Sequence, residues 1–198
     1  MALTVALLAA GRARRMRGRD KLLEVIDGKT LLRRQAERIL AARIGPLAVT
    51  LPPDRPARAA ALDGLPVTRL LVADAEEGLS VSLRTAARWA SGIAAEGLMI
   101  CPADLPDLGT DDFRALAAAF DPQGPPLRAT AEDGTPGHPV VFPARLLACF
   151  EVLVGDIGAR HLLRTHPPRL VALPAAHATT DLDTPEDWGR WREDRARL

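Results

Sequence analysis

The stretch LAAGRARRMRGRDKLL, Leu8–Leu23, carries six basic side chains between Arg12 and Lys21 and a single acid, Asp20. It overlaps the end of an apolar run, Thr4–Ala9, that has the length of a buried strand. The 198-residue chain has a formal net charge of only +1, so this positive charge is local. A glycine-containing turn after a strand presents backbone N–H groups, and basic side chains beside it suit a polyphosphate. The stretch therefore favours a nucleotide-phosphate loop, with a solvated arginine-rich loop as the alternative.

Two common phosphate-binding motifs are absent from this stretch. The pattern GxxxxGK[ST] fails because Gly18 is followed by Arg19 and not by lysine. The pattern GxGxxG fails because Ala13 stands where the second glycine belongs, and no acidic residue ends the second predicted strand. The sequence therefore supports neither a P-loop NTPase nor a Rossmann dehydrogenase.

Composition limits the classes of protein to consider. An apolar content of 47% with 26% charged residues excludes disorder, and residues 1–198 have the length of a single domain. The small net charge, and tryptophans that do not alternate with basic residues, argue against a nucleic-acid partner. Cys101 and Cys149 lack the spacing of a metal site, and the apolar run Leu3–Ala10 is too short to span a membrane. We expect a cytoplasmic protein without a membrane partner.

Strand-length apolar runs alternate with segments of helical spacing. The expected strands are Thr4–Ala9, Leu47–Leu51, Val67–Val72, Leu98–Cys101, Leu127–Thr130, Pro139–Phe142 and Leu170–Leu173. The expected helices between them are Thr30–Arg43, Ser80–Ala90 and Thr110–Ala119, the last capped by Thr110. This alternation predicts an α/β protein with a mostly parallel sheet and helices on both faces. Ligands then bind beyond the carboxyl ends of the strands.

Further unusual stretches follow the expected strands. They are EEGLSVSLR (76–84), CPADLPDL (101–108), GTPGHPVVF (134–142), GDIGAR (155–160) and DLDTPEDW (181–188). With the basic loop they resemble, in the same order, six motifs of the MobA-like NTP transferase family: LAAGxGxRMGxxK, EGxSxSL, LADMPxV, GxPGHPVLF, GDxGAR and DIDTPEDY. Within that family the chain resembles the molybdenum-cofactor cytidylyltransferases and their guanylyltransferase relatives. It departs from the first motif at Ala13 and at Arg17, each of which replaces a glycine.

The resemblance implies a three-layer α/β/α, Rossmann-like nucleotidyltransferase fold with a mostly parallel mixed sheet. It also implies transfer of CMP from CTP to the phosphate of a molybdopterin-type molybdenum cofactor, with release of pyrophosphate. CTP is preferred because the Ala9-Ala10 pair resembles the cytidylyltransferases, whereas guanylyltransferases usually have a glycine there. A molybdoenzyme that receives the product is a further possible partner.

Three alternatives to this reaction remain open. The first is a guanylyltransferase that uses GTP, and the second is a nucleotidyltransferase for a sugar or polyol phosphate, since the physics of the phosphate loop is shared. The third belongs to another class: a non-catalytic protein that binds and delivers the cofactor, which the departures at Ala13 and Arg17 suggest.

The resemblance assigns the nucleotide site to the basic loop and the EEGLS turn. The implied nucleotide-binding residues are Leu8, Ala9, Ala10, Gly11, Arg12, Ala13, Arg15, Lys21, Gly78 and Ser80. Among these, Arg15 and Lys21 are also catalytic candidates that hold the β- and γ-phosphates. We expect Lys21 to have little structural role because it lies in a loop beside other cations. Ser80 and Ser82 are candidates to contact the base, although Ser80 is equally suited to cap the following helix.

The metal candidates are carboxylates that follow strands. Mg²⁺ prefers oxygen ligands and needs only one or two carboxylates besides phosphate oxygens. Asp104 is the first candidate ligand and a catalytic residue, with a turn or helix cap as its alternative role. Asp183 is preferred over Asp181 as the second ligand, because alternate residues of one segment face opposite sides. Asp183 also begins DTPE, which is a well-formed helix start.

The acceptor side is assigned to His138 and Asp156, from the motifs GTPGHPVVF and GDIGAR. His138 lies in a turn before a strand, where it either contacts an anionic acceptor or closes the loop through backbone hydrogen bonds.

Overall fold

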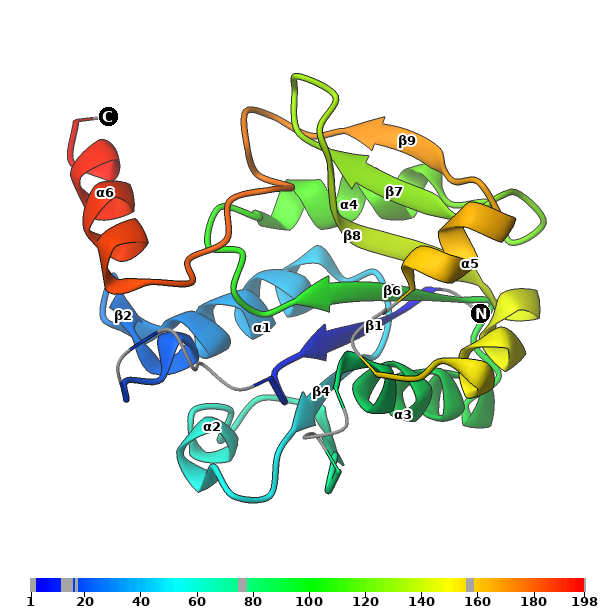
Figure 1. The fold of residues 1–198 in the computed structure, drawn as a ribbon, viewed down its shortest axis with the longest axis horizontal. Helices are drawn as coiled ribbons and strands as arrows, with labels where there is room; N and C mark the ends of the chain where they lie inside the picture. Colours follow the sequence, from blue (N-terminus) through cyan, green and yellow to red (C-terminus); the bar gives the residue numbers. More distant parts are fainter. Residues whose placement is uncertain (1–2, 12–15, 17, 75–77, 156–158, 198) are drawn as a thin grey trace.

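The computed structural model describes residues 3–11, 16, 18–74, 78–155 and 159–197. Within these ranges a seven-stranded sheet has the order β5-β4-β1-β6-β8-β7-β9 (Figure 1). Its strands are β1 (Leu3–Leu8), β4 (Leu47–Leu51), β5 (Thr68–Leu71), β6 (Gly97–Pro102), β7 (Leu127–Thr130), β8 (Pro136–Pro143) and β9 (Arg169–Ala172). β8 is antiparallel to both β6 and β7, and the other neighbouring pairs are parallel. The predicted mostly parallel, mixed sheet is confirmed.

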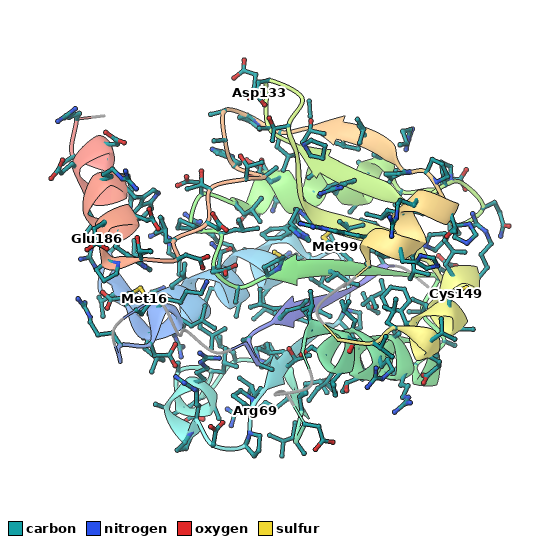
Figure 2. The ribbon with its side chains drawn as sticks, viewed as in Figure 1. Met16, Arg69, Met99, Asp133, Cys149 and Glu186 are labelled. Carbon is teal, nitrogen blue, oxygen red and sulfur yellow. The ribbon has the colours of Figure 1, made fainter. Side chains whose placement is uncertain are left out.

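Successive residues of the central strands face opposite sides of the sheet and form two cores. On β6, Met99 and Cys101 join one core, and Leu98 and Ile100 join the other. Figure 2 shows Met99 in the interior of the molecule and the side chain of Arg69 at its edge. Because both faces are buried, a central strand is a continuous apolar run, as in Leu47–Leu51, where all five residues are buried.

Helices cover both faces, which confirms the three-layer architecture (Figure 1). Residues of α1 (Leu31–Ala42) and α4 (Thr110–Ala119) pack into the core of Met99. Residues of α3 (Leu79–Gly92), the 3₁₀ segment η4 (Ala144–Val152) and α5 (Arg160–Thr165) pack into the core of Leu98. Every helix within the described ranges is too short or too polar to cross a lipid bilayer.

Shorter elements surround the carboxyl edge of the sheet. They are the 3₁₀ turn η2 (Lys21–Leu23), the hairpin β2 (Val25–Ile26) and β3 (Lys29–Thr30), the helix α2 (Pro56–Ala60) and the C-terminal helix α6 (Pro185–Arg195). α6 begins where the sequence predicts, because Thr184 Oγ1 accepts a hydrogen bond from the Asp187 N–H and the Asp187 carboxylate accepts one from the Thr184 N–H. Trp188 then buries all but 2% of its surface in the core.

Two helix caps differ from the sequence prediction. The cap of α4 is Gly109, whose N–H donates to Asp112 Oδ2 over 2.7 Å, and Thr110 is the first helical residue. The cap of α3 is Gly78, with φ of 102°, a value that only glycine adopts readily. Ser80 therefore lies inside the first turn of α3, and its N–H donates to the carbonyl of Gly155 over 3.1 Å.

Candidate active site

A cavity of about 520 Å³ opens at the carboxyl ends of β1 and β6, on the side of the sheet that α3 covers. Loop and strand-end residues supply its polar part, and apolar side chains of the sheet supply its floor. The lining residues used below are Leu8, Ala10, Gly11, Lys21, Gly78, Ser82, Asp104 and His138. The cavity therefore lies where a doubly wound sheet binds its ligands.

Lys21 joins two strand-end segments that are far apart in the sequence. Its ammonium nitrogen, Nζ, donates to Asp104 Oδ2 and to Asp183 Oδ1, each over 2.5 Å. The side chain of Lys21 is 15% exposed, so burial alone would lower its pKa. The charges and hydrogen bonds of the two carboxylates outweigh burial, and the pKa of Lys21 is raised above its ordinary value. The expectation that Lys21 has little structural role is wrong, because it bridges Asp104 and Asp183.

Asp183 faces Lys21 and Asp104, and Asp181 lies close to both carboxylates. Burial first, and then the negative charges of Asp183 and Asp104, raise the pKa of Asp181. Helix α6 holds this segment in place, because Trp191 Nε1 donates to Asp107 Oδ1 over 2.8 Å in the loop after β6. The Lys21 ammonium thus contacts the carboxylates of Asp104 and Asp183, and a third carboxylate, Asp181, lies near them.

The carboxylate pair is suited to a divalent cation. Asp104 Oδ2 and Asp183 Oδ1 already converge on one cationic centre, the Lys21 ammonium. In the described ranges, no group of three or more His, Cys, Asp and Glu side chains could enclose a metal. Mg²⁺ requires no such group, because one or two carboxylates and the phosphate oxygens of a nucleotide complete its coordination. The donor set fits a metal that binds together with a nucleotide.

Arg58 was not predicted from the sequence, yet it contacts both ends of the basic loop. Its side chain is fully buried and donates to the carbonyls of Ala9 and Gly11 over 2.5 and 2.8 Å. It also forms a two-pronged ion pair with Asp20, over 2.7 and 3.0 Å. Burial would raise the pKa of Asp20, but the hydrogen bonds and charge of Arg58 lower it. The segment PARAA gives no sequence signal for such a role.

The predicted nucleotide-binding residues fall into three groups. Five of them line the cavity: Leu8, Ala10, Gly11, Lys21 and Gly78. Ala9 and Ser80 are buried outside that lining, while Ser82 contributes to it. Arg12, Ala13 and Arg15 lie outside the described residues. Ser82 is therefore better placed than Ser80 to contact a ligand.

His138 lies inside β8 and not in a turn before that strand, because β8 begins earlier than the sequence predicts; it lines the cavity and also closes a loop. Its backbone N–H donates to the carbonyl of Ala178 over 2.9 Å. A Cβ on the preceding Gly137 would lie 2.0 Å from that carbonyl oxygen, so glycine is required for the close approach. Burial and then the positive charges of Arg128 and Arg160 lower the pKa of His138 to about 4. Both roles expected of His138 from the sequence, facing the cavity and closing the loop, are compatible with this position. The other predicted acceptor residue, Asp156, lies outside the described residues.

The buried, neutral imidazole predicts a pH effect on folding. Because the pKa of His138 falls from 6.5 to about 4 on folding, the unfolded chain binds more protons between these pH values. Stability from this group is therefore present above pH 6.5 and lost as the pH falls toward 4. Urea unfolding across this range should show a smaller acid loss for His138→Gln than for the unsubstituted protein. Equal losses would contradict burial of a neutral His138.

The α/β/α layers around a seven-stranded mixed sheet, with a cavity at its carboxyl edge, are the architecture of the α/β nucleotidyltransferase fold. Residues 5–170 match the MobA-like NTP transferase domain. The chain belongs to this family.

Relatives with curated names and solved structures agree with the assignment to this family. A molybdenum cofactor guanylyltransferase of Cereibacter sphaeroides is 33% identical over 193 residues, 93% of this chain and 92% of its own. The purine catabolism protein PucB of Bacillus subtilis is 29% identical over 195 residues, 91% of each chain. The crystal structure of Rv0371c from Mycobacterium tuberculosis has a TM-score of 0.81 and 27% identity, covering 97% of this chain and 98% of its own. A second structure of Rv0371c is a complex with manganese, with a TM-score of 0.77 and 25% identity over the same shares of the chains.

Proposed function

We propose that the protein transfers CMP from CTP to the phosphate of a molybdopterin-type molybdenum cofactor and releases pyrophosphate. The observation that carries this proposal is the convergence of Lys21, Asp104 and Asp183 at one edge of the cavity. The guanylyltransferase name of the relative from Cereibacter sphaeroides supports the choice of acceptor.

The proposed reaction needs no side-chain nucleophile. An oxygen of the acceptor phosphate forms a bond to the α-phosphorus of the nucleotide, and the bond from that phosphorus to the oxygen that links it to the β-phosphorus breaks. That oxygen leaves with pyrophosphate. Asp104 and Asp183 would hold Mg²⁺, which would supply positive charge to the phosphate oxygens; the manganese complex of Rv0371c supports a divalent ion. Lys21 and Arg15 orient the β- and γ-phosphates of the leaving pyrophosphate, and backbone N–H groups near Gly11 bind the triphosphate.

The residues around His138 favour an anionic acceptor. Arg128 and Arg160 lie close enough to lower the pKa of His138, and their charges offset the negative charge of an incoming phosphate. Arg128 is held beside this part of β8, because its Nε donates to the carbonyl of Gly137 over 3.1 Å. We propose that His138, as a neutral group, forms a hydrogen bond to the acceptor, and that Asp156 contributes to the same side.

The preference for CTP rests on the Ala9-Ala10 pair, of which Ala10 lines the cavity. Guanylyltransferases usually have a glycine at one of the Ala9-Ala10 positions, as described above. GTP is the second candidate nucleotide, because the relative with 33% identity is named a guanylyltransferase.

Product analysis tests this proposal directly. The protein is incubated with Mg²⁺, with CTP, GTP or ATP in turn, and with either molybdenum cofactor or a sugar or polyol phosphate. Pyrophosphate and product mass are measured. We expect pyrophosphate and the cytosine dinucleotide form of the cofactor with CTP. A guanine dinucleotide product would show that GTP, and not CTP, is the nucleotide substrate. Turnover only with a sugar or polyol phosphate would reject the acceptor, and cofactor binding without pyrophosphate release would support the delivery protein.

A further inference from the structure

Arg58 contacts both ends of the basic loop and is not among the residues that line the cavity. One nitrogen, Nη1, reaches the carbonyls of Ala9 and Gly11 at the end of β1. Nε and Nη2 bind the two oxygens of Asp20, the residue that precedes Lys21. We propose that Arg58 is a positioning residue, which sets the separation between Gly11 and Lys21 and so the shape of the triphosphate site. This inference rests on the proposed nucleotide-binding function.

Asp20 transmits this restraint to Lys21. Its Oδ1 accepts the N–H of Leu22 over 3.1 Å and so caps the 3₁₀ turn that begins at Lys21. A carboxylate that is 12% exposed keeps a fixed direction only when its oxygens are bonded, and Arg58 bonds both. Arg55 adds a contact to Oδ2 over 3.2 Å. The backbone of η2, and with it the origin of the Lys21 side chain, is therefore fixed relative to Arg58.

The choice of arginine is informative, because folding alone does not require it at a fully buried position. A well-packed apolar side chain commonly replaces a buried ion pair at little cost in stability. A planar guanidinium instead reaches three residues on two chain segments at once, in fixed directions. Lysine keeps the charge but cannot reproduce the two-pronged contact with Asp20. Arg58→Lys thus changes the geometry of the contact with Asp20 while it keeps the positive charge.

Nucleotide binding to Arg58→Lys tests the inference. Fluorescent CTP and GTP analogues are titrated with Mg²⁺ but no acceptor, at a temperature where thermal unfolding shows the variant to be folded. We expect the dissociation constant to rise by about 10- to 100-fold, since misplacing binding groups by about 1 Å costs this much. Asp20→Asn should give a loss in the same direction. The double variant should lose less than the sum of the two, because both substitutions break one contact.

Arg33→Met is the matched control. Arg33 also donates to two carbonyls, those of Ala61 and Asp63 over 3.1 and 3.0 Å, but it contacts neither end of the loop. We expect this variant to lose stability while it binds the nucleotide normally. Normal binding by folded Arg58→Lys, or an equal loss in Arg33→Met, would overturn the inference. If Arg58→Lys does not fold, a normal dissociation constant in folded Asp20→Asn would overturn it as well. The binding assay needs no acceptor, so an error in the proposed acceptor leaves this test valid.

Discussion

Asp104→Asn is expected to lower kcat for pyrophosphate release by about 100- to 1000-fold, the range found when one preorganised electrostatic group is removed. Asp104 Oδ2 lies 2.5 Å from the Lys21 ammonium and lines the cavity. The amide keeps the shape of the side chain but removes its charge, so it binds a divalent cation poorly. The fold should persist, because the amide oxygen still accepts a hydrogen bond from Lys21. Release of pyrophosphate with CTP, Mg²⁺ and molybdenum cofactor measures the effect.

The same substitution should remove a thermal signature of joint binding. A ligand that binds only the folded state raises its stability, and Mg²⁺ with CTP should stabilise the unsubstituted protein more than either does alone. Asp104→Asn should lose this joint effect. Asp107→Asn, three residues later in the same loop, keeps an acceptor for Trp191 Nε1 and should retain both activity and the joint stabilisation. Activity with Mg²⁺ in Asp104→Asn would refute the metal assignment.

The sheet was predictable because its strands are apolar runs separated by glycine and proline. The prediction was best for β4 and β7, whose bounds agree, and one residue off for β9, an edge strand. Edge strands have one open side, and Leu170 of β9 is 54% exposed. The hairpin β2–β3 and the helix α2 were not predicted, because two-residue strands show no alternation and a five-residue helix is too short to show helical periodicity. Contacts with distant segments stabilise such short elements.

The candidate site was predictable only as a set of strand ends. A parallel sheet gathers strand ends, so Asp104 and Asp183 could be expected at one edge. The bridge by Lys21 could not be expected, because it spans 83 and 162 positions of the sequence. Arg58 was missed for the same reason, since its partner Asp20 is 38 positions away and its segment has no motif. Long-range charge pairs depend on the path of the loops, which local patterns do not encode.

Lys21→Ala should weaken nucleotide use and also the fold. Loss of a charge-assisted hydrogen bond to phosphate costs roughly 1.5–3 kcal/mol, so kcat/KM for CTP should fall by about 10- to 100-fold. In the absence of nucleotide the substitution leaves the carboxylates of Asp104, Asp181 and Asp183 without their shared cation. Because the Lys21 side chain is partly buried, Lys21→Ala should lower the free energy of unfolding by about 1–3 kcal/mol.

The pKa of Lys21 determines the pH range in which this loss is seen. Because its pKa is raised on folding above 10.5, the ion pairs of Lys21 contribute fully at neutral pH. Their contribution is lost only as the pH rises through the pKa of the folded state. Urea unfolding at pH 7 therefore measures the full difference between Lys21→Ala and the unsubstituted protein.

The response of Lys21→Ala to Mg²⁺ distinguishes the loss of phosphate binding from the loss of the ion pairs with Asp104 and Asp183. If Asp104 and Asp183 form a cation site, Mg²⁺ alone should raise the melting temperature of Lys21→Ala more than that of the unsubstituted protein, because the Lys21 ammonium no longer competes for the two carboxylates. Lys29→Ala is the control: Lys29 Nζ also donates to a carboxylate, Glu37 Oε2 over 2.5 Å, but on an exposed surface. It should show neither the kinetic loss nor the Mg²⁺ response. A normal kcat/KM in Lys21→Ala would exclude Lys21 from phosphate binding. If Mg²⁺ does not raise the melting temperature of Lys21→Ala, Asp104 and Asp183 do not form a metal site.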